Sequence, residues 1–313
     1  MTGAAIAGVS RAVPETVVPN APIAARLGVD EAWIESRTGM RERRVLADGE
    51  RLSDLAARAG AGALEAAGMA PGDVDMILVG TTSSDEMSPH TAAIVAGELG
   101  ADGAAAIDLS AACTGFLSGL ALATSAIESG RSRGALVIGA DGLSRYLDPD
   151  DRGSAMLFGD GAGAVALRAV DGPSAVGPVA LHSDAGGRDL IRLPRDELRI
   201  RMDGPIVFRH AVRLLSEVTR EAADAAGVGL GEIDLFVYHQ ANGRIIDAVG
   251  RELGLAPGRV VDVVDRFANT SAASLPIALS VAVEEGRLDA GDRVLLAAFG
   301  AGLVWGGTVV RWG

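Results

Sequence analysis

Residues 113–130 read CTGFLSGLALATSAIESG, and residues 269–286 read NTSAASLPIALSVAVEEG. The two segments have the same length, and each begins with a small polar doublet and ends in acidic residues and glycine. Between these ends almost every side chain is apolar or small, which is typical of a helix buried on all sides. The pair therefore predicts two central helices, one starting at Cys113 and the other at Asn269.

The sequence around these helices is repeated as well. Residues 66–75 read AAGMAPGDVD and residues 225–234 read AAGVGLGEID; an alanine-rich, helix-like stretch precedes each, and an apolar, strand-like run follows it. This repeat predicts two diverged halves, roughly residues 1–170 and 171–313, built from alternating strands and helices. Two buried helices between two sheets give an α/β fold with five layers, αβαβα. A pseudo-twofold axis between the halves would bring the start of one central helix close to the start of the other.

Composition narrows the classes of function. The chain has 313 residues, a formal net charge of −13 and no lysine, which disfavours a nucleic-acid-binding protein. No apolar run is long enough to cross a bilayer, and no signal peptide is recognisable, so we expect a cytoplasmic protein with no membrane association. A single cysteine excludes an internal disulfide and a cysteine-based metal cluster. We expect neither a metal nor a cofactor.

Cys113 is the first candidate for chemistry. A lone free cysteine is more often a buried, inert apolar residue. Cys113, however, lies between a strand-like run and a long helix, and a helix N-terminus stabilises a thiolate and lowers the thiol pKa. This position predicts a nucleophile suited to attack on a thioester.

His239 and Asn269 are the next candidates. His239 directly follows a strand-like run, where loop residues often form sites, although a lone loop histidine can equally be structural. Asn269 suits an ordinary helix N-cap. Only its symmetry with Cys113 makes it a candidate site residue.

Two glycine-rich stretches also need an interpretation. Residues 159–164 match a loose dinucleotide-binding pattern, but they lead into a strand rather than a helix, so we reject a nucleotide loop. Residues 300–307 also lead into a strand. The backbone N–H groups there could form an oxyanion hole, or the stretch could be a tight turn that needs glycine.

The chain resembles β-ketoacyl-(acyl carrier protein) synthase III, a family of the thiolase-like superfamily. Six motifs carry this resemblance in the family's order: DEAWIESRTGMRERR (30–44), AACTGF (111–116), DDRGSAMLFGDGAGA (150–164), YHQANGRII (238–246), FANTSAAS (267–274) and AFGAGLVWG (298–306). Asn269 in the third catalytic position distinguishes the chain from the elongating synthases, which use two histidines. A single cysteine distinguishes it from the thiolases, which need two.

The resemblance implies a two-step reaction. Cys113 attacks an acyl-CoA and becomes acylated, with the oxyanion held by backbone N–H groups of Cys113 and the Ala301 region. Malonyl-acyl carrier protein then loses CO₂, and His239 and Asn269 stabilise the enolate by hydrogen bonds. The enolate attacks the acyl group to give a β-ketoacyl product.

The resemblance also implies binding residues. Trp33 and Arg152 would sandwich the adenine of CoA, Arg37 would contact its phosphates, and Asn242 would support the histidine loop beside the CoA site. Arg209 and Arg244 would contact acyl carrier protein. For each arginine a solvated surface position is the alternative, for Trp33 ordinary packing, and for Asn242 an Asn-Gly turn.

The acyl pocket is where the sequence departs from its acetyl-primed relatives. In those relatives a bulky aromatic residue from the neighbouring subunit closes the pocket. In this sequence the small Ser88 lies at about that position. We therefore expect a pocket that accepts primers longer than acetyl; the alternative is that another side chain fills the space. The resemblance also places Phe299 beside the nucleophile, with ordinary core packing as the alternative. The family implies a homodimer and fatty-acid initiation. The alternatives are a priming ketosynthase of a polyketide pathway, an acyltransferase related to synthase III and a non-catalytic scaffold subunit.

Overall fold

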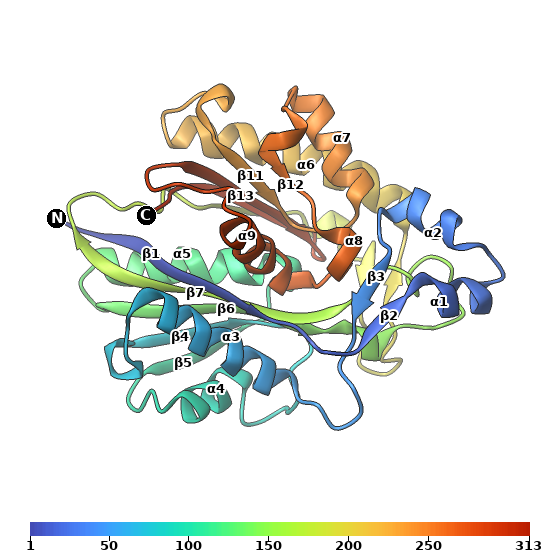
Figure 1. Ribbon diagram of the computed structural model, residues 1–313, viewed down its shortest axis with the longest axis horizontal. Helices are drawn as coiled ribbons and strands as arrows, with labels where there is room; N and C mark the ends of the chain where they lie inside the picture. Colours follow the sequence, from blue (N-terminus) through green and yellow to red (C-terminus); the bar gives the residue numbers. More distant parts are fainter.

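Two five-stranded sheets form the frame of the protein, and the computed structural model describes all residues from Met1 to Gly313 (Figure 1). The first sheet has the strand order β1-β7-β6-β4-β5. Its strands are β1 (Thr2–Ala12), β4 (Met76–Gly80), β5 (Ala105–Leu109), β6 (Gly134–Gly142) and β7 (Asp160–Asp171). The second sheet has the order β12-β11-β13-β14-β8. Its strands are β8 (Ala180–Ser183), β11 (Leu235–Tyr238), β12 (Val260–Val261), β13 (Arg293–Gly300) and β14 (Val304–Arg311).

Helices complete the layers. In Figure 1, α5 (Gly115–Glu128) and α9 (Ser274–Glu284) lie between the two sheets. Helices α3 (Leu52–Ala67) and α4 (Thr91–Leu99) cover the outer face of the first sheet, and α6 (Gly204–Ala225) and α7 (Gly243–Leu253) cover the second. The predicted α/β fold with five αβαβα layers is confirmed.

The strand pairing follows the same pattern in both sheets. In the first sheet β4 pairs in parallel with β5 and β6, and β7 pairs antiparallel with β6 and β1. In the second, β11 pairs in parallel with β12 and β13, and β14 pairs antiparallel with β13 and β8. Parallel strands covered on both faces are apolar throughout, and every residue of β6 and β11 is buried. Two 3-10 turns, η2 (Ala112–Thr114) and η7 (Ser271–Ala273), lead into α5 and α9 and contact each other; β13 also contacts η2, and β6 contacts η7.

The central helices differ in their burial. Every residue of α9 from Ser274 to Ala282 is buried, as its apolar sequence predicts. In contrast, α5 leaves Leu122 49% exposed. The prediction that both helices are buried on all sides is therefore wrong for α5. The reason is its place beside β5, which is an edge strand of its sheet and covers only part of the helix.

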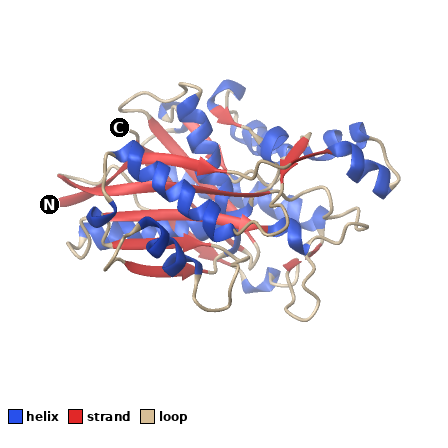
Figure 2. Ribbon diagram, turned by 60° about the horizontal axis from the view of Figure 1, so that its bottom comes forward, coloured by secondary structure: helices blue, strands red, loops and turns tan.

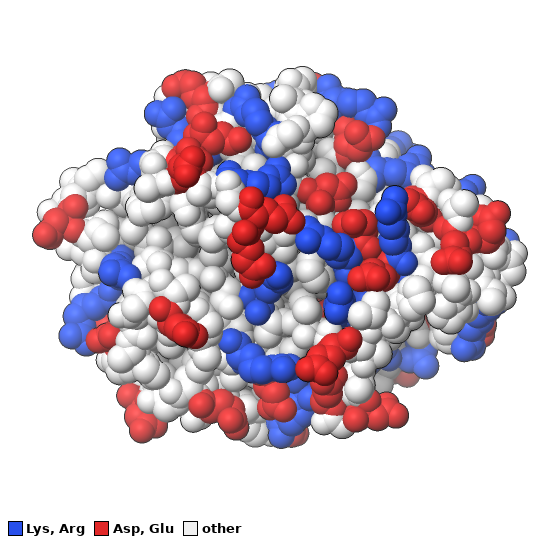
Figure 3. Space-filling model, in the orientation of Figure 1, with Lys and Arg blue, Asp and Glu red and all other residues white.

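Smaller elements extend the sandwich on one side, at the right of Figure 1. Figure 2 shows their short helices and strands apart from the long strands of the two sheets. They are β2 (Val17–Pro19), α1 (Asn20–Leu27), α2 (Glu31–Thr38), β3 (Glu42–Arg44), β9 (Ile191–Arg192), β10 (Arg201–Met202) and α8 (Val264–Phe267). None of the helices is long and apolar enough to span a bilayer. Acidic and basic side chains are interspersed over the face in Figure 3, so no single sign of charge dominates it.

Candidate active site

Cys113 lies in η2 (Ala112–Thr114), a single 3-10 turn between β5 and α5. Its sulfur accepts a hydrogen bond from the Ser271 hydroxyl at 3.4 Å, and the residue is half-buried. Burial, together with the nearby Asp141 carboxylate, raises the pKa of the Cys113 thiol to about 12, although the Ser271 hydrogen bond acts in the opposite direction. This direction is opposite to the predicted one, because burial outweighs the Ser271 hydrogen bond.

Asn269 lies two residues before η7 (Ser271–Ala273), the turn that leads into α9. Its side-chain oxygen accepts the backbone N–H of Ser271 at 2.8 Å, and its own backbone is held against Leu157 and Gly159. Because the oxygen is engaged in this turn, the amide NH₂ group is the end of the side chain left to donate to another molecule. Asn269 is therefore not the N-cap of α9, which is Ala273; its side chain instead closes the turn before η7 and also lines the cavity described below.

His239 follows β11 directly and is buried. Its backbone N–H donates to Ala297 at 2.8 Å, and its ring Nδ1 lies 2.6 Å from the Ser274 hydroxyl. Burial lowers the pKa of His239 to about 3, so the ring is neutral at physiological pH. The next residue, Gln240, holds this loop through hydrogen bonds to Tyr238, Val261 and Val263.

The Asp141 carboxylate connects the loop after β4 to the turn η7. It is fully buried at the end of β6 and accepts hydrogen bonds from Thr82 N–H at 2.9 Å, the Ser83 hydroxyl at 2.7 Å and Ala272 N–H at 3.3 Å. Burial raises its pKa, while these donors lower it. One carboxylate therefore ties the loop after β4 to the turn that carries Asn269.

Cys113, His239 and Asn269 line one cavity of about 1370 Å³. Ala301 and Phe299, at the end of β13, line it as well. The backbone N–H groups of Cys113 and Ala301 donate to no carbonyl of the chain. The cavity thus combines one thiol, two neutral side-chain donors and two unpaired backbone donors, which suits acyl transfer through an oxyanion.

Comparisons with known proteins identify the family. Residues 107–185 match the family described as 3-oxoacyl-[acyl-carrier-protein (ACP)] synthase III, and residues 223–312 match the C-terminal region of that family. A β-ketoacyl-[acyl-carrier-protein] synthase III of Streptomyces coelicolor is 48% identical over 99% of this chain and 94% of its own length. The chain belongs to the 3-oxoacyl-(acyl carrier protein) synthase III family.

Solved structures of this family superpose on the whole chain. The synthase III of Pseudomonas aeruginosa is 42% identical, with a TM-score of 0.93 and coverage of 99% of this chain and 98% of that one. A priming β-ketosynthase from a polyketide biosynthetic pathway is 35% identical, with a TM-score of 0.94 and coverage of 99% and 96%. This chain is therefore similar both to fatty-acid synthases III and to a polyketide priming enzyme.

The residues that the family resemblance assigned to CoA all lie around the cavity. They are Trp33, Arg37, Arg152 and Asn242. Arg37 stacks on the Trp33 ring, with its guanidinium carbon 4.2 Å from the ring centroid, whereas Arg152 donates to the carbonyl of Leu27. Asn242 caps α7 by accepting Arg244 N–H and donates to the carbonyl of Arg37. Trp33 is therefore paired with Arg37 here, and a sandwich with Arg152 stays a prediction.

The two predicted carrier-protein contacts lie at the same cavity. Arg209 belongs to α6 and Arg244 to α7, and both line the cavity. Arg244 packs over the Phe208 ring at 5.5 Å from its centroid. Neither arginine forms an ion pair within the chain, so both charges are available to an anionic partner.

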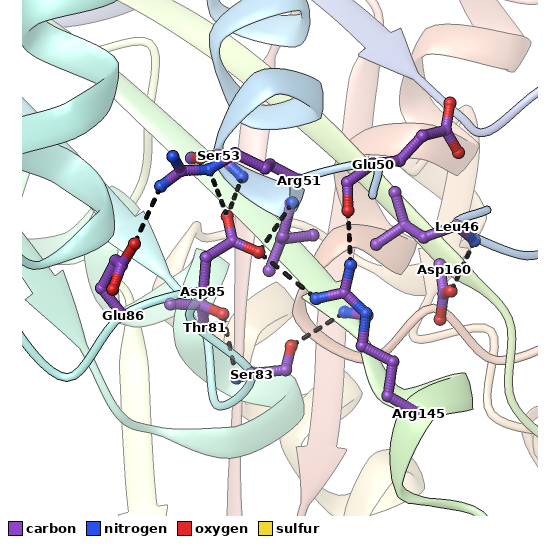
Figure 4. Close-up of polar contacts among 12 residues, drawn as sticks. Leu46, Glu50, Arg51, Ser53, Thr81, Ser83, Asp85, Glu86, Arg145 and Asp160 are labelled. Atoms are coloured by element: carbon purple, nitrogen blue, oxygen red, sulfur yellow. Dashed lines mark hydrogen bonds and ion pairs between the residues drawn. The ribbon is translucent and has the colours of Figure 1, made fainter. Parts of the chain in front are cut away.

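Ser88 is exposed and does not line the cavity of its own chain, whereas its neighbour Met87 does. Both belong to the loop that follows β4. Figure 4 shows how Asp85 fastens this loop to the start of α3, between Arg51 and Arg145. The Asp85 carboxylate accepts the backbone N–H groups of Leu52 and Ser53 at 3.0 and 2.8 Å.

The sequence prediction missed one wall of the cavity. The segment from Ile191 to Met202 contributes seven lining residues: Ile191, Arg192, Leu193, Arg195, Leu198, Ile200 and Met202. Arg192 and Arg195 add two cations to the four predicted ones. One pair of strands, β9 and β10, shapes this segment, and both strands are too short to show an alternating pattern. Arg192 and Arg195 were the available signal in the sequence for a basic wall.

Proposed function

We propose that this protein is a β-ketoacyl-acyl carrier protein synthase III in which Cys113 carries the acyl group. The observation that supports this most directly is the meeting of Cys113, His239 and Asn269 in one cavity of a synthase III fold. In the first step the Cys113 sulfur attacks the carbonyl carbon of an acyl-CoA. A new carbon–sulfur bond forms, the bond to CoA breaks, and CoA leaves as its thiol with the proton from Cys113.

The unpaired N–H groups of Cys113 and Ala301 would hold the oxyanion of this step. Both lie at the cavity and lack a carbonyl partner, so they need no rearrangement to receive a negatively charged oxygen. Because these donors are already in place, they also offset the lower reactivity of a thiol that is protonated at rest.

In the second step malonyl-acyl carrier protein loses CO₂. The electron pair of the broken carbon–carbon bond moves onto the thioester carbonyl and forms an enolate, which His239 and Asn269 would stabilise as neutral donors. The enolate carbon then attacks the acyl-Cys113 carbonyl; a carbon–carbon bond forms, the carbon–sulfur bond breaks, and Cys113 leaves as a thiolate that takes up a proton from water. Burial keeps His239 neutral, which suits a donor better than a permanent cation would.

The arginines around the cavity support the proposed substrates. Six of them line it: Arg37, Arg152, Arg192, Arg195, Arg209 and Arg244. Guanidinium groups bind phosphate well because their donors form a rigid fork. CoA and the phosphopantetheine arm of a carrier protein both carry phosphate, so one ring of cations would serve both half-reactions.

We also propose a homodimer. Strand β5 is an edge strand whose outer side has no partner, and Ile107 on it is 43% exposed. Leu122 on the adjoining helix and Met87 on the loop after β4 are exposed by 49% and 92%. An unprotected edge with exposed apolar side chains favours pairing with a second copy. In such a dimer the Ser88 loop would approach the partner's acyl pocket, and its small side chain would leave room for primers longer than acetyl.

One assay tests the main proposal. The protein is incubated with a panel from acetyl-CoA to dodecanoyl-CoA, and the acyl adduct on Cys113 is measured by intact mass before malonyl-acyl carrier protein is added. We expect an adduct, release of CO₂ and a β-ketoacyl product, with Cys113→Ala giving no adduct. The absence of an adduct with every acyl-CoA contradicts the proposal, and a strict preference for acetyl-CoA contradicts the prediction for Ser88.

A second function has one observation in its favour. The similarity to a polyketide priming β-ketosynthase supports the same chemistry in a polyketide pathway. The pathway is distinguished by the carrier protein: higher turnover with a polyketide carrier protein than with the fatty-acid carrier protein would assign it. An adduct that passes only to alcohols or amines, without loss of CO₂, would instead identify an acyltransferase. The cytoplasmic location stays a prediction.

A further inference from the structure

The ring of His239 is held at Nδ1 by the hydroxyl of Ser274. The two atoms are 2.6 Å apart, and both side chains are buried. His239 comes from the end of β11, and Ser274 is the first residue of α9. The contact thus links the histidine loop to the helix that follows Asn269.

The direction of this hydrogen bond follows from the other partners of Ser274. Its oxygen already accepts the backbone N–H of Gln240 at 3.3 Å, which uses one lone pair. Its hydrogen still needs an acceptor, because a buried hydroxyl donor without one is costly. Other buried helical hydroxyls donate to a carbonyl four residues earlier, as Thr219 does to Leu215 at 2.7 Å. Ser274 has no such carbonyl partner, and Nδ1 of His239 is the one acceptor within reach.

If the ring donated instead, the Ser274 hydrogen would be buried without a partner. The satisfied arrangement has the Ser274 hydroxyl donating to an unprotonated Nδ1. A neutral imidazole carries one hydrogen, so it then lies on Nε2.

We propose that Ser274 is a positioning residue that holds His239 in the tautomer protonated at Nε2, so that the ring presents a donor to the bound thioester. The inference rests on the proposed function, in which His239 donates to the carbonyl of malonyl-acyl carrier protein. Burial supports it, because it keeps the ring neutral and leaves the choice of tautomer to the neighbours.

Asn269 is oriented by the same principle. Its side-chain oxygen accepts Ser271 N–H, which leaves its NH₂ group to donate. Each of the two proposed donors is therefore fixed by a hydrogen bond at its opposite end. Both of these bonds come from the first turns that lead into α9, at Ser271 and Ser274.

The tautomer can be read directly by nitrogen NMR of protein labelled with ¹⁵N-histidine, since the chain has only 4 histidines. The His239 signals are assigned by their loss in His239→Gln. We expect Nε2 to be protonated and Nδ1 to be unprotonated in the wild type, with Ser274→Ala giving a mixture of tautomers and Ser274→Thr restoring the first. A wild-type ring protonated at Nδ1 overturns the inference, whether or not the protein is active.

The two half-reactions provide the second test. We expect Ser274→Ala to lower kcat for decarboxylation of malonyl-acyl carrier protein roughly tenfold or more, with KM within about twofold. Acylation of Cys113 should change little, and Ser274→Thr should recover most of the decarboxylation. The matched control is Ser280→Ala, a buried serine of the same helix that contacts Arg11 instead of the site.

Full decarboxylation by Ser274→Ala contradicts the inference. An equal loss of both half-reactions also contradicts it, since that would indicate general disruption of the site. Failure of the proposed function gives a different result: the wild type would then neither form an acyl adduct nor release CO₂, while the NMR spectrum would still report the tautomer.

Discussion

The Ser271 hydroxyl lies 3.4 Å from the Cys113 sulfur. This contact joins the two turns that the internal repeat makes equivalent, η2 before α5 and η7 before α9. Gly115 allows the start of α5 to pack closely against β4, because a Cβ there would lie 2.9 Å from the Cα of Gly80. The nucleophile thus lies half-buried at the junction between the halves, on the wall of the cavity.

This location predicts the reactivity of the thiol. Because burial raises the pKa of Cys113 to about 12, the rate of its alkylation by iodoacetamide should rise about tenfold for each pH unit from 7 to 10. The modified residue can be followed by intact mass, since the chain has one cysteine. A plateau in the rate near neutral pH would mean that the helix N-terminus lowers the thiol pKa after all.

His239 predicts a loss of stability in acid. Its pKa is about 3 when folded and about 6.5 when unfolded, so the unfolded state binds the extra proton between these values. The contribution of neutral His239 to the free energy of unfolding is present above pH 6.5 and is lost as the pH falls towards 3. Between pH 6.5 and 5 it lowers the free energy of unfolding by about 2 kcal/mol.

The measurement compares urea unfolding of the wild type and His239→Asn at both pH values. The acidic residues titrate in both proteins, so their contribution cancels in the difference. We expect the wild type to lose about 2 kcal/mol more than the variant over this range. Parallel losses would show that His239 is protonated in the folded protein.

The repeat and the apolar runs predicted the layers of the fold well. Strands such as β6 and β11 are apolar because helices cover both of their faces, and that burial is visible in the residues themselves. Periodicity could not predict the exposed side of α5. Leu122 reads as a core residue, and its exposure depends on where the sheet ends rather than on the helix.

The candidate site was predictable at its centre and less so at its edges. Motifs placed Cys113, His239 and Asn269, but the raised thiol pKa depends on burial and, to a smaller extent, on Asp141, a carboxylate at the end of β6. The wall from Ile191 to Met202 has no regular pattern to recognise, because each of its strands is only two residues long. The division into halves at about residue 170 stays a prediction, since buried residues of both parts share one central core.

Gly139 packs closely against η7, the turn that follows Asn269. A Cβ on Gly139 would lie 2.0 Å from the carbonyl oxygen of Ala272, which is backbone and cannot move aside easily. Gly139→Ala should therefore lower the free energy of unfolding by about 1–3 kcal/mol or more, and it should reduce decarboxylation by displacing the turn. Thermal unfolding and CO₂ release measure the two effects.

Gly97→Ala is the matched control for this substitution. Gly97 lies in α4, and nothing lies within 4 Å of a Cβ built there. Alanine should stabilise this helix by about 0.5–1 kcal/mol and leave CO₂ release unchanged. Equal stability of the two variants would refute close packing at Gly139.

The Asp85 carboxylate caps α3 and thereby fastens the loop that carries Ser88. The residue before α3, Arg51, provides no side-chain cap, and Asp85 supplies it from 33 residues away by accepting Leu52 and Ser53 N–H. Its carboxylate is 9% exposed and also contacts Arg145. Burial favours the neutral carboxyl, but the backbone donors of Ser53 and Leu52 and the Arg145 guanidinium hold its pKa below the ordinary value.

Asp85→Ala should therefore lower the free energy of unfolding at pH 7 by about 1–2 kcal/mol, as loss of a helix cap does. With a lowered folded pKa, this contribution is present above the unfolded pKa and disappears as the pH falls through the folded one. Glu86→Gln is the control, because Glu86 is exposed and contacts only Arg51 at 3.4 Å, so its removal should change stability by less than about 0.5 kcal/mol. Equal unfolding midpoints for the two variants would show that Asp85 neither caps α3 nor anchors the loop.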